Sequence, residues 1–315
     1  MASPFFSVVV TTYNRETLIR RCLDSCLAQS FEDFELVVVD DCSTDDTAAV
    51  LAAYEDPRLK PVLLPENRGI NPARRAGAEN ADGEWVVVVD SDWELLPHTL
   101  ERLREVIAAL PREVRVIRSQ LLWDDGSVTP RTMPAGTIGY EERIRWVEEE
   151  GGHDAGRCIA RAVFERTPYI DDRRGAQELL FELDLARNER TLCLPEVLGK
   201  EHSDAANSYL RGTSAAELIP RLLDEAPDQL WMAETTLREH GEALRRAGPR
   251  QYRELLRVAS MQALLLGERG KGLRYGLAAL RRRPWDVRAL ATLAFGLLGR
   301  RAAARGILLA RRLAR

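Results

Sequence analysis

The stretch Val8-Val9-Val10-Thr11-Thr12-Tyr13-Asn14 joins a run of valines directly to a polar, aromatic segment. The same change recurs at Leu36-Val37-Val38-Val39-Asp40-Asp41 and at Trp85-Val86-Val87-Val88-Val89-Asp90-Ser91-Asp92. Solid apolar runs of this length are typical of strands that are covered on both faces, as in a parallel sheet. In such sheets ligands bind beyond the carboxyl ends of the strands. The three runs therefore predict a site at that edge, with carboxylates suited to a divalent metal and a nucleotide.

Helical and strand patterns alternate around these runs. Apolar residues at helical spacing predict helices near residues 15–29, 45–54, 72–81, 97–110 and 178–187. Further strands are expected at 59–64, 114–118, 120–123 and 194–200, with a turn at Asp125-Gly126 and an irregular region over 132–157. This order predicts an α/β fold, in which a mixed, Rossmann-like sheet is flanked by helices.

The last third of the chain has a different pattern. From about Ala205 onward the spacing is helical, with breaks expected at Pro220, Pro227, Gly248-Pro249 and Pro284. We therefore expect two domains, a catalytic one over residues 1–205 and an all-helical C-terminal region over residues 206–315 that is basic from about residue 269.

Composition narrows the class of protein. The chain has 315 residues and a formal net charge of −4, which by itself favours neither nucleic acid nor an acidic partner. Its five cysteines are odd in number and contain no CxxC pair, so we interpret them as small buried residues in a reducing compartment. Neither a signal peptide nor an apolar run of about 20 residues is visible. These features predict a cytoplasmic protein.

Four motifs in order resemble the family 2 glycosyltransferases of the GT-A fold. They are Ser7–Asn14, Val39–Asp45, Asn67-Arg68-Gly69 and Gly83–Asp92, and the resemblance covers roughly residues 5–205. It implies a metal-dependent, inverting transfer of a sugar from a nucleotide-diphosphate sugar to a hydroxyl of a saccharide, a lipid-linked or another acceptor. A nucleotidyltransferase would carry a Gly-rich, basic loop after the first strand, where this chain has Thr11–Arg15. A non-catalytic relative that binds sugar or membrane is the other alternative.

The metal site is expected at Asp90-Ser91-Asp92. Two carboxylates separated by one residue on an extended segment point the same way. The resemblance implies that Asp92 contacts Mn²⁺ or Mg²⁺ and that Asp90 faces the ribose or the sugar. It also implies that His202 coordinates the metal or contacts the diphosphate. Many relatives have a further acid at the position of Trp93, which either walls the sugar pocket or packs in the core.

The nucleotide pocket is expected around Asp41. By resemblance, Asp41 accepts a hydrogen bond from the N3–H of uracil, Tyr13 stacks on the base and Thr11 completes the pocket. Asp40 either caps the turn or faces the ribose. A thymine base presents the same imide edge, so the donor is UDP-linked or dTDP-linked. Arg74 fits the family position for a phosphate-binding guanidinium better than Arg75 does.

An inverting transferase needs a carboxylate that takes the proton of the acceptor hydroxyl. Family members supply it from a Glu-Asp pair that opens a helix. Gln177-Glu178 stands at this place, so the resemblance assigns Glu178 as the base, with Glu182 and Asp184 as rivals. The first turn of a helix also favours an acid for purely electrostatic reasons.

The C-terminal segment from Arg269 to Arg315 contains 13 Lys and Arg residues and a single acid, Asp286. Its helices, expected at 287–298 and 303–313, place arginines beside apolar residues. Such helices either lie in the interface of an anionic membrane or pack as a helical subdomain with a solvated arginine face. Nucleic acid is a third option, although interleaved aromatic residues are lacking.

Overall fold

The computed structural model describes residues 3–150, 155–170, 173, 178–202 and 215–297. The chain divides into two compact units. The first comprises Met1–Asp172 with Phe181–Ala206, and the second comprises Arg173–Leu180 with Asn207–Arg315. Among the described residues, no helix combines the length and the apolar character that crossing a bilayer requires.

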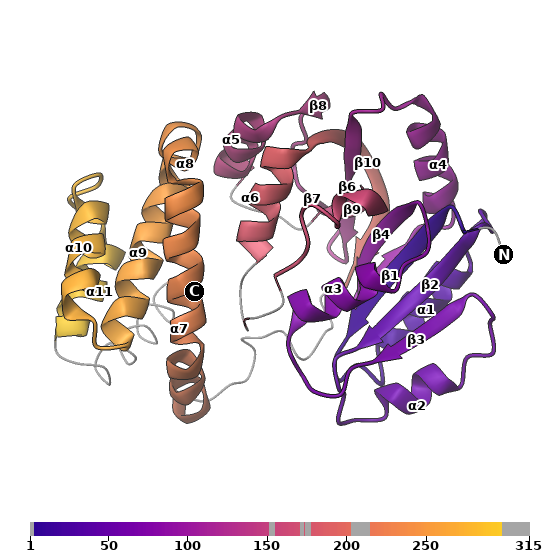
Figure 1. Cartoon of the computed structure of the whole chain (residues 1–315), viewed down its shortest axis with the longest axis horizontal. Helices are drawn as coiled ribbons and strands as arrows, with labels where there is room; N and C mark the ends of the chain where they lie inside the picture. The colour runs from indigo at the N-terminus through magenta and orange to yellow at the C-terminus, as the bar shows by residue number, and fades with distance from the viewer. Residues whose placement is uncertain (1–2, 151–154, 171–172, 174–177, 203–214, 298–315) are drawn as a thin grey trace. The chain divides into compact units, whose positions relative to one another are not determined.

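The first unit is built on one sheet of ten strands, whose main order is β3-β2-β1-β4-β9-β6-β10-β5 (Figure 1). The strands are β1 (Phe6–Thr12), β2 (Phe34–Asp40), β3 (Leu59–Leu63), β4 (Trp85–Asp90), β5 (Trp93–Leu95), β6 (Val114–Trp123), β7 (Val128–Thr129), β8 (Gly136–Ile138), β9 (Gly156–Ala160) and β10 (Arg190–Glu201). Strands β1 to β4 pair in parallel, as do β6 and β10, while β9 runs antiparallel between β4 and β6. The mixed, helix-flanked sheet predicted from the sequence is confirmed.

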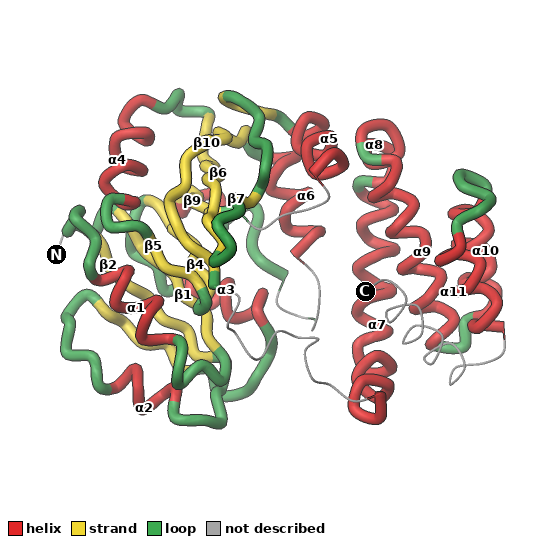
Figure 2. The backbone as a smooth tube through the Cα atoms, turned by 180° about the vertical axis from the view of Figure 1, so that it is seen from behind, coloured by secondary structure: helices red, strands yellow, loops and turns green. Residues whose placement is uncertain are grey.

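Helices cover both faces of this sheet. They are α1 (Ile19–Leu27), α2 (Thr47–Ala52), α3 (Ile70–Glu79), α4 (Thr99–Ala109), α5 (Tyr140–Glu150) and α6 (Glu178–Asn188). Alternate strand residues face opposite ways, so Val8 and Val10 pack in one core with α1, α2 and α4, while Val9 packs with Ala73 of α3 on the other face. Figure 2 shows the face that carries α1 and α4. Phe181 and Leu185 of α6 pack beside Val116 and Ile159 on the α3 face.

The register of the strands places the residues at the ends of β1, β2 and β4 side by side, at the edge of the sheet where the sequence predicts a site. Thr11 lies opposite Val39 of β2 and Asp90 of β4, so the turns that follow β1, β2 and β4 begin at the same level. Two antiparallel pairings, β4 with β9 and β9 with β6, bring β6 back parallel to β4. The carboxyl ends of β6 and β10 therefore lie at this same edge of the sheet.

Three expectations about local structure are wrong. Residues 132–157 contain α5, whose mostly charged sequence buries only Ile144 and Trp146 and therefore lacks a clear apolar stripe. The two strands expected over 114–123 are one strand, because Ser119 continues the ladder opposite Gly156 and Leu194.

The third concerns the prolines of α7 (Ala215–Glu239), which runs through Pro220 and Pro227 without a break. A proline in a helix interior costs about 3 kcal/mol. Burial offsets this cost, since Leu222, Ala226 and Leu230 recur at helical spacing and are all buried. Tertiary packing thus keeps this helix continuous although its two prolines favour a break.

The second unit continues with α8 (Gly241–Ala247), α9 (Pro249–Leu265), α10 (Arg269–Leu280) and α11 (Val287–Leu297). Breaks at Gly248-Pro249 and Pro284 occur as predicted. A Cβ at Gly276 would lie 2.5 Å from the Leu293 side chain, so the missing side chain lets α10 and α11 approach closely. The helix predicted over 303–313 lies outside the described residues.

Candidate functional site

The turn after β2 shows that Asp40 and Asp41 have different tasks. Asp40 Oδ1 accepts hydrogen bonds from the backbone amide of Ser43, at 3.1 Å, and from its hydroxyl. Asp40 therefore caps its own turn, one of the two roles left open by the sequence.

Asp41 is buried and holds the loop that precedes α3. Its two carboxylate oxygens accept the backbone N–H groups of Arg68, at 2.9 Å, and Gly69, at 2.7 Å. Gly69 has a φ of +96°, a conformation that glycine adopts without steric cost. A carboxylate oxygen accepts more than one hydrogen bond, so this role is compatible with the predicted contact to a base.

The turn after β1 presents an aromatic ring at the same edge. Thr11 is buried, whereas Tyr13 is 42% exposed directly after the strand. Asn14 follows in the left-handed region at φ +52°, and its side-chain oxygen accepts the amide N–H of Thr44 at 2.8 Å. This bond ties the turn after β1 to the turn after β2. An exposed aromatic ring beside this polar turn has the chemistry that stacking on a flat base requires.

Arg74 and Asp90 form a buried pair at the end of β4. Arg74 Nη2 donates to Asp90 Oδ1 at 2.7 Å, and the Arg74 side chain is only 1% exposed. Burial alone would raise the pKa of Asp90, but the guanidinium groups of Arg74 and Arg157 outweigh it and hold that pKa below its usual value. Arg75 instead pairs with Glu79 on the exposed side of α3. Arg74 is thus the buried one of the two arginines, and its predicted contact with a phosphate stays a prediction.

His202 lies next to the Asp92 backbone and between two carboxylates. Its backbone N–H donates to the Asp92 carbonyl at 3.1 Å. Its Nδ1 lies 2.8 Å from Asp124 Oδ1, and its Nε2 lies 2.7 Å from Glu94 Oε1. Trp93 is 3% exposed within the core, so it packs there rather than lining an open pocket.

The residues at this edge offer the oxygen ligands that a hard divalent cation takes, but within the described residues the ligand atoms of Asp92, Glu94 and Asp124 do not lie within 4.8 Å of one another. Glu94 and Asp124 also pair with Arg21 and Lys200, each at 3.3 Å. Asp92, Glu94 and Asp124 supply carboxylates near the end of β4 and β6, and carboxylates are preferred ligands of Mg²⁺ and Mn²⁺. His202 fits less directly, because each of its ring nitrogens already has a carboxylate partner. It could bind a metal only by exchanging one of them.

On α6, the two rivals of Glu178 both bind arginine. Glu182 pairs with Arg118, and its carboxylate oxygens lie 3.6 Å from Arg143 and 3.7 Å from Arg157. Burial works to raise the pKa of Glu182, but the three guanidinium groups lower it to about 2. Such a group stays ionised and poorly accepts a proton near neutral pH.

Asp184 binds Arg187 at 2.5 Å. Glu178 is the first residue of α6, is half-buried and groups with the second unit. Its role as the base stays a prediction.

Sequence reasoning missed Glu94, Asp124 and Arg157. Glu94 stands two residues after Asp92, but Asp92 lies in the turn between β4 and β5, so strand alternation from the DxD segment does not place Glu94. Asp124 follows β6 directly, which is the same signal that identified Asp41. Arg157 carried no local signal, because its place depends on the register that sets it opposite Val88 and Arg118.

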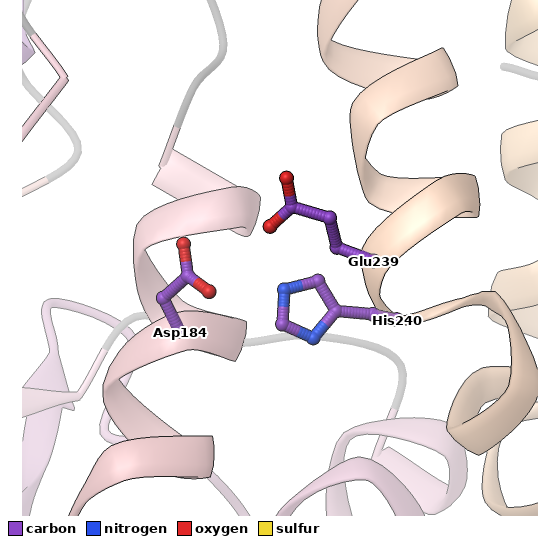
Figure 3. Close-up of side chains that lie close together, drawn as sticks. All are labelled: Asp184, Glu239 and His240. Carbon is purple, nitrogen blue, oxygen red and sulfur yellow. The ribbon is translucent and has the colours of Figure 1, made fainter.

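Figure 3 shows three further groups, Asp184, Glu239 and His240. Asp184 belongs to the first unit, whereas Glu239 and His240 stand at the junction of α7 and α8 in the second. They therefore define no metal site within either unit.

The chain is similar to known glycosyltransferases in sequence and in fold. Residues 7–161 match the family described as Glycosyl transferase family 2. The chain is 41% identical over 123 residues to the succinoglycan biosynthesis protein ExoO of Rhizobium meliloti, covering 39% of this chain and 35% of that protein. It spans between 30% and 58% of the lengths of the first curated relatives that it matches.

Two solved structures share the fold. Residues 1–349 of S. aureus TarS, in complex with UDP-GlcNAc, align at a TM-score of 0.62 and 20% identity, covering 98% of this chain and 92% of that one. The mannosyltransferase PcManGT from Pyrobaculum calidifontis, in complex with GDP-Man and Mn²⁺, aligns at 0.53 and 22% identity, covering 98% and 88%. By its motifs and this match, the segment of residues 7–161 is similar to the family 2 glycosyltransferases, and the chain shares the GT-A fold of these structures.

Proposed function

We propose that this chain is a metal-dependent, inverting glycosyltransferase that uses a UDP-linked sugar. The observation that carries the proposal is the shared edge of β1, β2 and β4, where an exposed Tyr13, a buried Asp41 and the Arg74–Asp90 pair meet. That UDP-GlcNAc occupies a structural neighbour supports a uridine donor, with dTDP and GDP donors as alternatives.

In the proposed reaction an acceptor hydroxyl oxygen attacks the anomeric carbon as the bond from that carbon to the diphosphate oxygen breaks. The proton of the hydroxyl passes to Glu178, and the nucleoside diphosphate leaves. Tyr13, Thr11 and Asp41 bind the base, while Arg74 orients Asp90 toward the ribose or the sugar. A bound Mn²⁺ or Mg²⁺, held by Asp92 and by His202 after a change of partner, would neutralise the charge of the leaving diphosphate.

The proposal extends to the rest of the chain. Residues 1–205 would be the catalytic domain and residues 206–315 a helical accessory region. The acceptor would be a saccharide or a lipid-linked saccharide, and nucleic acid would not be a partner. The enzyme would work in the cytoplasm, with peripheral membrane contact through its basic C-terminal helices.

Release of nucleoside diphosphate from UDP-GlcNAc, other UDP-sugars and dTDP-sugars with Mn²⁺ tests the proposal. Wild type should release UDP only with the metal, and Asp92→Asn should lower the rate by at least about 100-fold. Glu178→Gln should slow transfer by roughly 100-fold or more while donor binding persists. Glu79→Gln, on the exposed side of α3, is the matched control and should leave the rate unchanged. Metal-independent turnover, or equal rates for Glu178→Gln and wild type, would contradict the proposal.

A further inference from the structure

The turn between α10 and α11 carries large apolar side chains on its outside. We define the α10–α11 tip as Arg281–Val287 with Leu277, one turn before it, and Leu290, one turn after it. Trp285 is 84% exposed, Val287 75%, Leu277 50% and Leu290 43%. The small residues Ala279 and Ala289 are buried together in the interior at this same end. Four large apolar side chains at this end thus face water, although Leu256 of α9 is buried beside the two alanines.

The same tip is strongly basic. Arg281, Arg282, Arg283 and Arg288 are all exposed. The guanidinium of Arg282 lies 4.6 Å from the centre of the Tyr252 ring, which fixes it on α9. Four exposed arginines therefore lie within four residues of the exposed Trp285 in the sequence.

The only acid between residues 269 and 297, Asp286, is already engaged. Its Oδ1 accepts the backbone N–H groups of Arg288, at 3.0 Å, and Ala289, at 3.1 Å, so it caps α11. Its Oδ2 lies 3.5 Å from Nε of Arg253 on α9. Asp286 therefore stabilises the turn from within. Burial works to raise the pKa of Glu254 on α9, but the nearby guanidinium of Arg288 helps to lower it. Arg281 and Arg283, in contrast, form no ion pair with a carboxylate in the part of the chain that the structure describes.

We propose that the α10–α11 tip docks on an anionic lipid surface. Tryptophan and aliphatic side chains partition into the boundary between headgroups and acyl chains, while arginines bind anionic headgroups. A nucleic-acid surface would need aromatic side chains repeated along a basic groove, whereas the tip pairs one tryptophan with aliphatic residues. A second copy of the chain would meet the tip with four like charges. This inference goes beyond sugar transfer, and its test needs no nucleotide sugar.

The test is co-sedimentation of the full chain with vesicles of phosphatidylcholine alone or mixed with phosphatidylglycerol. Binding should require phosphatidylglycerol and should weaken as salt rises from about 0.1 M to about 1 M, because the Debye length falls from ~10 Å to ~3 Å. The double variant Trp285→Ser with Val287→Ser should bind at least about tenfold more weakly. Arg281→Gln with Arg283→Gln should lose roughly tenfold and show a flatter salt dependence.

Matched controls distinguish docking through the tip from non-specific adsorption to vesicles. Leu63→Ser removes a 61% exposed apolar side chain from β3, and Arg75→Gln removes a half-buried arginine of α3 that pairs with Glu79. Both should bind vesicles as wild type does. Tryptophan fluorescence should be quenched by brominated lipid in wild type and less so in Trp285→Phe.

Three results would overturn the proposal. One is vesicle binding that is absent or is unchanged by the tip variants. Another is binding to duplex DNA, and not to vesicles, that the tip variants abolish. The third is a dimer, seen by light scattering, that Trp285→Ser with Val287→Ser converts to monomer while vesicles have no effect.

Discussion

The buried arginines in and beside the sheet of the first unit and the exposed arginines of the α10–α11 tip are one residue type in opposite settings. Arg74, Arg118 and Arg157 are each at most 4% exposed in their side chains, and each lies near a carboxylate of Asp90 or Glu182. Arg281 and Arg283 are exposed, and the one nearby acid caps a helix.

The difference shows that burial decides what an arginine does. A buried guanidinium cannot lose its proton and needs a carboxylate beside it, so it fixes the elements that carry the two groups. In this sheet, Arg157 influences both Asp90 and Glu182 and thereby links β4 to α6. An exposed guanidinium contributes little to folding and remains available to a partner surface.

The largest expected effect comes from removing the carboxylate at the centre of the buried cluster. Glu182→Ala leaves Arg118, Arg143 and Arg157 without their shared partner. It should lower the free energy of unfolding by about 3–5 kcal/mol, measured by urea denaturation. Glu79→Ala, which breaks an exposed pair with Arg75, should change it by less than about 0.5 kcal/mol. Equal small losses in both variants would mean that the cluster is solvated like a surface.

Acid should remove the same stabilisation without mutation. The pKa of Glu182 is about 2 in the folded chain against an ordinary value of 4.5. A lowered folded-state pKa stabilises the protein above pH 4.5, and this contribution is lost as the pH falls toward 2. It amounts to about 3 kcal/mol. The difference in unfolding free energy between wild type and Glu182→Gln should shrink over this window, and parallel curves for the two proteins would contradict the assignment.

The contrast also explains what could be predicted from the sequence. Solid valine runs predicted the strands and the acids at their ends, because burial on both faces leaves a continuous local signal. The roles of Asp40 and Trp93 were left open, since a hydrogen bond to Ser43 and burial in the core are properties of the folded turn and strand. The Glu182 cluster was not foreseen, because its partners come from β6, β9 and α5 and meet only through long-range register. Helix α5 was missed because charged residues hide its narrow apolar face.

A smaller loss is expected from the pair of Arg74 and Asp90 at the end of β4. Arg74→Ala leaves the Asp90 carboxylate without its 2.7 Å partner and should cost about 2 kcal/mol of unfolding free energy. It should also reduce the thermal stabilisation that UDP and Mn²⁺ give to the wild type, because Asp90 loses its orientation. The neighbouring change Arg75→Ala should alter neither quantity. If UDP and Mn²⁺ raised the melting temperature of Arg74→Ala as much as that of wild type, the orientation of Asp90 would have no part in donor binding.

The smallest effect on folding should come from the tip. Arg281→Gln with Arg283→Gln should leave the unfolding free energy within about 0.5 kcal/mol of wild type, although the same variant should weaken vesicle binding. A measurable loss of stability would mean that these arginines fix structure as Arg74 and Arg157 do, and the contrast between the two regions would fail. Unchanged stability with weaker vesicle binding would mean that Arg281 and Arg283 act on a partner surface and not on the fold. Exposed charges without a carboxylate partner contribute to such contacts and little to folding.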